Sequence, residues 1–153
     1  MLPEATGPRA LPESIGRLKH GCMPVLTTLS AVECERLLRR GTFGRAVVMS
    51  PLGPEIVPVN YAVQGDEIVV RVSASSTLAR HGTGDVVFEV DQVDHDRWHG
   101  WSVVARGTGV VVEAVPGDHE VGTRVRPWVD GERPYELRLT WSELTGRRVG
   151  GSR

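Results

Sequence analysis

The feature that most constrains this sequence is a change of hydrophobic period after Gly41. Beyond it, short apolar runs alternate with clusters of Gly, Pro, Asn and Asp, a pattern typical of antiparallel strands joined by turns. The runs predicted to be strands are residues 45–49, 56–62, 67–72, 86–90, 101–115, 135–141 and 145–149. Six or seven strands with two small helices predict a mainly β fold, and they favour a closed antiparallel barrel over an open sandwich.

Turn residues set the expected connections between these strands. Gln64-Gly65-Asp66 predicts a hairpin between residues 56–62 and 67–72, and the polar stretch 91–100 is predicted to be a loop. Gly107 and Gly109 fall within the longest apolar run, at a point where a barrel strand must bend sharply.

Two short helices are predicted beside the strands. Ser30 and Glu33 have the spacing of a capping box ahead of an apolar stripe, and Gly41 ends this first helix. Residues 75–81 predict a second helix, which Gly82 closes.

Length and charge bound the organisation of the chain. The 153 residues suit a single domain, with a flexible Pro- and Gly-rich tail over residues 1–28 and a barrel domain over residues 29–153. A net charge of -1 argues against a nucleic-acid-binding surface. Because no run approaches the ~20 apolar residues of a membrane helix, and the N-terminus lacks a secretory apolar region, we expect a cytoplasmic protein without a membrane partner.

Residue counts also limit the chemistry. Lys19 is the only lysine, so no lysine of the predicted barrel can form a Schiff base, and anions must be bound there by arginine, hydroxyl groups or backbone amides. His95 and His99 have a spacing that binds zinc on a helix, but they fall in a predicted loop without a third ligand, so no metal site is predicted. Cys22 and Cys34 are expected to be reduced thiols without a chemical role. No pattern identifies a catalytic residue.

Four segments occur in a distinctive order and spacing. They are Leu29–Cys34 leading into Gly44-Arg45; Pro58-Val59-Asn60-Tyr61; Phe88–Asp91 followed by Gly100–Val103 and Arg106-Gly107; and Pro127-Trp128 followed by Leu137–Leu139 and Thr145–Arg147. In this order they resemble the pyridoxamine 5′-phosphate oxidase-like, FMN-binding split β-barrel family, in particular its short actinobacterial type. The resemblance covers residues 29–149.

The resemblance implies a homodimer with two FMN sites, each built from both chains. It places Pro58, Val59, Asn60 and Tyr61 along the flavin ring, and it places Arg71, Val72, Ser73, Ser76, Thr77 and Leu78 near the ribityl chain and phosphate. It also implies that the partner chain contributes Trp101, Ser102 and Trp128. Arg71 suits the phosphate because a guanidinium group forms a fork of charged donors.

The chain departs from the usual pattern of this family at two positions. Family members usually carry Arg-Thr on the third strand and a lysine at the helix start, whereas this chain has Arg71-Val72 and Ser76-Thr77. The leading hypothesis is an FMN-dependent oxidoreductase that exchanges a hydride between the ring and a small-molecule substrate, with enzymatic turnover left open. The alternatives are a protein that binds or senses a flavin, a deazaflavin coenzyme or haem without turnover, and a structural dimer without a cofactor.

Overall fold

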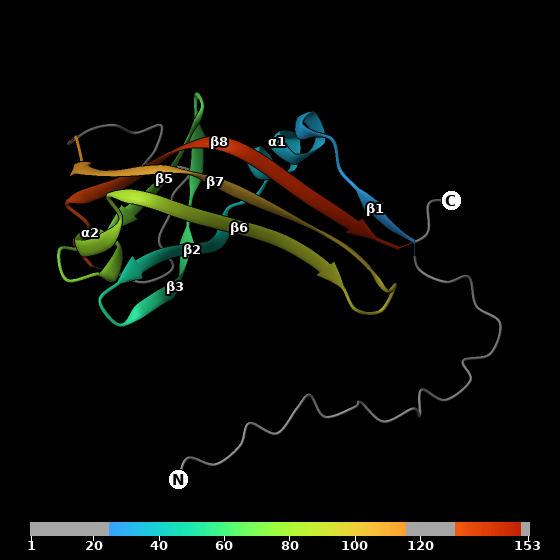
Figure 1. Cartoon of the computed structure of the whole chain (residues 1–153), viewed down its shortest axis with the longest axis horizontal. Coiled ribbons are helices and arrows are strands. Elements are labelled where there is room, and N and C mark those ends of the chain that lie inside the picture. The colour runs from blue at the N-terminus through green and yellow to red at the C-terminus, as the bar shows by residue number, and fades with distance from the viewer. Residues whose placement is uncertain (1–24, 116–130, 151–153) are drawn as a thin grey trace, which may run out of the picture.

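The computed structural model describes residues 25–115 and 131–150. Trp128, Cys22, the predicted crossover over residues 116–128 and the predicted tail up to residue 24 lie outside this part of the chain. In chain order, the elements are β1 (Leu26–Thr28), α1 (Ala31–Arg40), β2 (Phe43–Ser50), β3 (Gly53–Asn60), β4 (Ala62–Gln64), β5 (Glu67–Val72), α2 (Thr77–His81), β6 (Gly84–Asp94), β7 (His99–Glu113) and β8 (Tyr135–Val149) (Figure 1).

The strands form one antiparallel sheet that closes on itself. Their order is β3-β2-β6-β7-β8-β5-β4, and β1 pairs with β8 beside this path. The two strands at the ends of this order, β3 and β4, are consecutive in the chain and are separated only by Tyr61. The single run Gly53–Gln64 therefore pairs with β2 at its start and with β5 at its end, and it joins the two edges of the sheet. The predicted mainly β split barrel is confirmed, with eight strands in the described residues.

Tyr61 fills the interior at the point where the barrel closes. Its side chain is 1% exposed and packs edge-on against Phe88, with ring centroids 4.8 Å apart. The hydroxyl group donates a hydrogen bond of 2.6 Å to the carbonyl oxygen of Leu38 in α1. Gly41 follows this helix, and a Cβ atom there would collide with the same hydroxyl group. Tyr61 thus ties the C-terminal end of α1 to the closing strand.

Both predicted helices are present, and serine caps begin each of them. The Ser30 hydroxyl accepts from the amide of Glu33, and the Glu33 carboxylate accepts from the amide of Ser30, which is the predicted capping box. The second helix, α2, is shorter than predicted because the Ser76 side chain caps it and Thr77 is its first residue.

Three of the predicted strand assignments differ from the structure. The predicted strand 56–62 is divided between β3 and β4, so its main partner is β2 and only residues 62–64 form the hairpin with β5. The predicted loop 91–100 is wrong, because only residues 95–98 form the turn between β6 and β7. The predicted strands 135–141 and 145–149 form the single strand β8. Backbone hydrogen bonds between neighbouring strands continue through polar residues, so an apolar pattern does not reveal where such a strand ends.

The predicted irregularity at Gly107 is confirmed. The register between β7 and β8 shifts between Arg106 and Gly107, and a Cβ atom at Gly107 would overlap the carbonyl oxygen of Thr140. Only glycine allows the two backbones to approach this closely.

Strands β6, β7 and β8 extend well beyond the barrel interior as a long twisted ribbon (Figure 1). One end of this ribbon lies near α2 and β5, and the other end carries the β6–β7 turn and β1. Neither helix in the described part of the chain is long and apolar enough to span a membrane.

Replacement of Tyr61 by phenylalanine tests the role of its hydroxyl group. At neutral pH we expect Tyr61→Phe to lower the free energy of unfolding by about 1–2 kcal/mol, because the Leu38 carbonyl loses its buried donor. Burial raises the pKa of the Tyr61 phenol. The wild type therefore loses stability as the pH rises above ~10, where the unfolded tyrosine ionises first, and the variant lacks this contribution. Urea denaturation at pH 7 and pH 10.5 should show a smaller difference between the two proteins at the higher pH; a pH-independent difference would contradict the prediction.

Candidate functional site

The predicted ring-binding segment lies at the junction of β3 and β4, and its four residues face different environments. Pro58 is exposed and Asn60 is half-buried, so both present atoms to a ligand, and the Asn60 amide donates to the carbonyl oxygen of Thr42 at 3.3 Å. Val59 packs partly against the core. Tyr61 is buried, its hydroxyl group is bonded to Leu38, and its amide donates to the carbonyl oxygen of Thr42 at 3.0 Å, so both of its donors are used within the protein.

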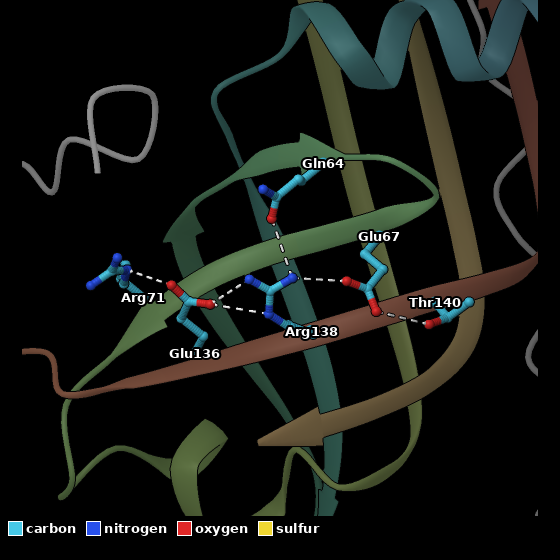
Figure 2. Close-up of polar contacts among 6 residues, drawn as sticks. All are labelled: Gln64, Glu67, Arg71, Glu136, Arg138 and Thr140. Atoms are coloured by element: carbon cyan, nitrogen blue, oxygen red, sulfur yellow. Dashed lines mark hydrogen bonds and ion pairs between the residues drawn. The ribbon is translucent and has the colours of Figure 1, made fainter. Parts of the chain in front are cut away.

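Arg71, the predicted phosphate fork, lies at one end of a ladder of charged side chains on β5 and β8. It is directly opposite Glu136 in the antiparallel register, with its Nε 2.9 Å from the carboxylate Oε1. The other carboxylate oxygen of Glu136 accepts from Nε and Nη2 of Arg138, at 3.1 and 2.8 Å. Arg138 also donates through Nη1 to Glu67 and Gln64 (Figure 2).

Glu136 is the buried centre of this ladder. Its side chain is 3% exposed, whereas those of Arg71 and Arg138 are 20% and 26% exposed. A carboxylate at this depth is tolerated because two guanidinium groups flank it, and removal of one partner of such a pair is costly. The pattern Glu-Leu-Arg on β8 shows that residues 136 and 138 share a face, but nothing in the sequence shows that this face is buried.

Arg71 retains donors for a ligand. Its Nε is close to Glu136 but is not aligned for a hydrogen bond, so both Nε and Glu136 Oε1 are buried without a hydrogen-bond partner among the described residues. In the same part of the chain, the two terminal nitrogens of Arg71 make no hydrogen bond or ion pair. A guanidinium group that is held from one side and free on the other suits an anionic group such as a phosphate.

The predicted phosphate contacts around α2 are largely used within the protein. The Ser76 hydroxyl accepts from the amide of Ala79 at 3.0 Å, and the Ser73 carbonyl accepts from the amide of Ser76. Val72 and Leu78 are buried in the core, so their side chains do not reach a ligand.

Thr77, at the position where the resemblance implies a lysine, contacts a carboxylate of this chain. Its hydroxyl group donates to Glu55 of β3 at 3.1 Å. The hydroxyl groups of Ser50 and Thr77 hold the pKa of Glu55 below its usual value, and the nearby guanidinium group of Arg80 contributes. Sequence reasoning missed Glu55, because its distance of more than twenty positions from Thr77 gives no signal of the contact.

Trp101 and Ser102 lie at the other end of the ribbon from Arg71. They pair with Arg148 and Arg147 of β8, whereas Arg71 pairs with Glu136. Twelve residues of extended chain span about 40 Å. In one chain, Trp101 and Ser102 are therefore too distant from Arg71 for one small molecule to contact both. The predicted ring segment lies between these two ends, because Pro58 is opposite Arg45, and Arg45 pairs with Asp91. Trp128 lies outside the described residues.

Comparison with known proteins identifies the family. Residues 30–148 match the family model described as pyridoxamine 5′-phosphate oxidase, and the chain belongs to this family.

Relatives of known sequence or structure agree with this assignment. The uncharacterized protein Rv0080 of Mycobacterium tuberculosis is 28% identical over 123 residues, which cover 76% of this chain and 81% of that protein. The FAD binding protein from Mycobacterium smegmatis is 29% identical, with a TM-score of 0.62 over 81% of this chain and 98% of that chain. A putative pyridoxamine 5′-phosphate oxidase from Corynebacterium glutamicum is 28% identical, with a TM-score of 0.66 over 84% of this chain and 96% of that chain.

The ladder of charged side chains predicts that removal of Glu136 lowers the free energy of unfolding much more than removal of Glu67. We expect Glu136→Ala to lower the free energy of unfolding by about 3–5 kcal/mol, because Arg71 and Arg138 are left facing each other without the carboxylate between them. The matched control Glu67→Ala removes a carboxylate that is 35% exposed, and it should cost about 1 kcal/mol or less. Urea denaturation of the three proteins measures both effects, and equal losses would show that the burial of Glu136 has no energetic consequence.

Proposed function

We propose that the protein is a flavin-dependent oxidoreductase that binds FMN and a small-molecule substrate at sites formed by two copies of the chain. Membership of the pyridoxamine 5′-phosphate oxidase family over residues 30–148 supports this proposal, as does the similarity to a FAD binding protein. The observation that carries it is the placement of Arg71 on the strand beside the β3–β4 junction, as a partly buried arginine whose terminal donors have no partner among residues 25–115 and 131–150.

Each part of the chain has a definite role in this proposal. The terminal nitrogens of Arg71 bind the phosphate, while Glu136 fixes the guanidinium group from the opposite side. Pro58 and Asn60 line the edge of the ring, and buried Tyr61 supports this segment from inside the barrel. When bound, the flavin supplies the hydride chemistry, which needs no acid or base from the protein at the ring itself.

A second copy of the chain completes the site in this proposal. Trp101 and Ser102 are separated from Arg71 by about 40 Å of strand, so they can serve the same ligand only if they come from a partner chain. The barrel also exposes an apolar face, with Met49 67% and Ile56 66% exposed, beside half-buried Val47 and Val87. An exposed apolar surface of this kind marks a protein interface.

A second candidate function is a dimer that binds its ligand without turnover, or that binds no cofactor at all. The contact between Glu55 and Thr77 favours this candidate. At the position where the resemblance implies a lysine, this chain has a hydroxyl group that donates to a carboxylate of the protein itself, so it supplies no cation to a ligand. A deazaflavin coenzyme and haem are the alternative ligands for such a dimer.

Purification and ligand release test the proposed function. We expect the purified protein to be yellow, to release FMN on denaturation, and to have its bound flavin reduced by a nicotinamide cofactor. In Arg71→Ala the affinity for FMN should fall about 10- to 100-fold, because charged hydrogen bonds are lost, while the affinity for riboflavin, which lacks the phosphate, should stay nearly constant.

The control for this experiment is Arg106→Ala, which removes an exposed arginine of β7 that pairs with Glu143. It should leave both affinities unchanged in fluorescence titrations. An equal loss of FMN and riboflavin binding in Arg71→Ala would contradict the phosphate role. Bound flavin that no nicotinamide cofactor reduces would favour the binding protein, and colourless protein that ignores added flavin would favour the remaining alternatives.

The proposed dimer makes a separate prediction. Sedimentation equilibrium should give twice the chain mass of 16.7 kDa. We expect Ile56→Asp to shift the protein toward the monomer without loss of stability, because this side chain is 66% exposed in the single chain and a charge there is penalised only when a partner covers it. An unchanged dimer would place the interface elsewhere, and a monomeric wild type would exclude the shared site.

A further inference from the structure

A basin lies on one face of the ribbon, at the end distant from Arg71. It has a volume of about 620 Å³, within the ~300–1,000 Å³ range of small-molecule sites. The strand register explains its shape, because two rows of residues cross it from β6 to β8: Asp91, Ser102 and Arg147 in one row, and Val93, Gly100 and Val149 in the next. Gly100 has no side chain, so the backbone forms a flat floor between the two valines.

The rim of the basin is unusually apolar for a surface exposed to water. Trp98 is 81% exposed, Leu26 60%, Val93 55% and Val149 41%, and all four line this one basin. Four large apolar side chains gathered around a hollow are a feature of ligand sites rather than of ordinary surface.

Trp98 is also held in a backbone conformation that its side chain disfavours. Its φ angle is 52°, the only positive value at a non-glycine position among the described residues. Asn, Asp or Gly is expected at such a position in a turn, and strained residues of this kind concentrate at functional sites. The strain places an indole ring at the mouth of the basin, although a glycine would satisfy the turn.

The acidic side chains of the basin have partners within the protein, whereas its arginine has none among the described residues. Asp91 is paired with Arg45 at 2.9 Å, and Asp94 accepts from the backbone amides of Asp96 and Arg97. Arg147 is exposed and makes no ion pair or hydrogen bond within the described residues. The basin therefore combines acids that already have partners with one arginine that does not.

We propose that this basin binds a planar organic anion, with Arg147 pairing with its carboxylate and Trp98 covering its ring. The flat floor at Gly100 and the apolar rim accept an aromatic ring, and the free guanidinium group selects a negative charge over a neutral group. The two residues that define the proposal, Arg147 and Trp98, have no part in the flavin assignment. Trp101 and Ser102 also line the basin, so the basin adjoins the surface that is proposed to reach a partner chain's flavin.

The adjacent residue Arg148 provides a matched control. It points to the opposite face of β8, where it lies 3.9 Å from Glu33 and lines a different hollow. Arg147→Gln and Arg148→Gln therefore remove the same charge at neighbouring positions, but only the first removes it from the basin.

The test uses the full-length protein as purified and two probes of nearly identical shape, 2-naphthoate and its uncharged amide, 2-naphthamide. Titration calorimetry should show saturable binding of 2-naphthoate, with the amide at least about tenfold weaker, the factor expected for loss of one charged hydrogen bond. Arg147→Gln should reduce the affinity for 2-naphthoate to that for the amide, and Arg148→Gln should leave both affinities unchanged. Trp98→Gly, which also relieves the positive φ, should weaken both probes to a similar degree.

Other outcomes would overturn the proposal. Absence of saturable binding to the wild type would show that the basin is not a ligand site or that a second chain covers it. Equal effects of Arg147→Gln and Arg148→Gln would show that only the general charge of the surface matters. Unchanged binding of both probes in Trp98→Gly would remove the indole from the site.

Discussion

Closure of the barrel depends on one run of chain that changes partners at a single residue. Residues 53–60 pair with β2, residues 62–64 pair with β5, and Tyr61 lies between them with its side chain in the core. Because the Tyr61 hydroxyl group must reach the Leu38 carbonyl, the same residue fixes how the end of α1 sits on the barrel. A residue that serves closure in this way cannot also offer its side chain to a ligand. In the segment Pro58-Val59-Asn60-Tyr61, the side chains of Val59 and Tyr61 therefore pack in the protein, and only those of Pro58 and Asn60 are accessible to a ligand.

The length of β8 then determines what one chain can do. This strand pairs with β5 at Glu136, with β7 along its whole length, and with β1 at its end. The buried charge ladder and the apolar basin both depend on it, yet they lie at opposite ends. The protein therefore has two polar centres of different character. At one, guanidinium groups flank a buried carboxylate, and at the other an exposed arginine has no partner in the described part of the chain.

Much of the architecture could be predicted from the sequence because it is encoded locally. The capping box at Ser30, the turn at Gly65 and the irregularity at Gly107 each follow from a few neighbouring residues. Arg71 could be singled out because the expected site had so few candidate cations. The partners of these residues could not be predicted, since Glu136 and Glu55 meet Arg71 and Thr77 only through strand register and helix placement. The full length of β6 could not be predicted for a related reason. Asp91 and Asp94 are polar, and they belong to the strand because their backbone pairs with β7, not because of their side chains.

The contact between Glu55 and Thr77 also bears on how the chain can change during evolution. The family resemblance implies a lysine at the position of Thr77, and a lysine introduced there would meet the carboxylate of Glu55. Its charge would be neutralised internally, so the substitution alone would restore little anion binding. Loss of the Glu55 charge alone would leave the hydroxyl groups of Ser50 and Thr77 without their acceptor and would supply no cation. We therefore expect substitutions at the two positions to be coupled, so that a lysine at position 77 supplies a cation to a ligand only when Glu55 is also replaced.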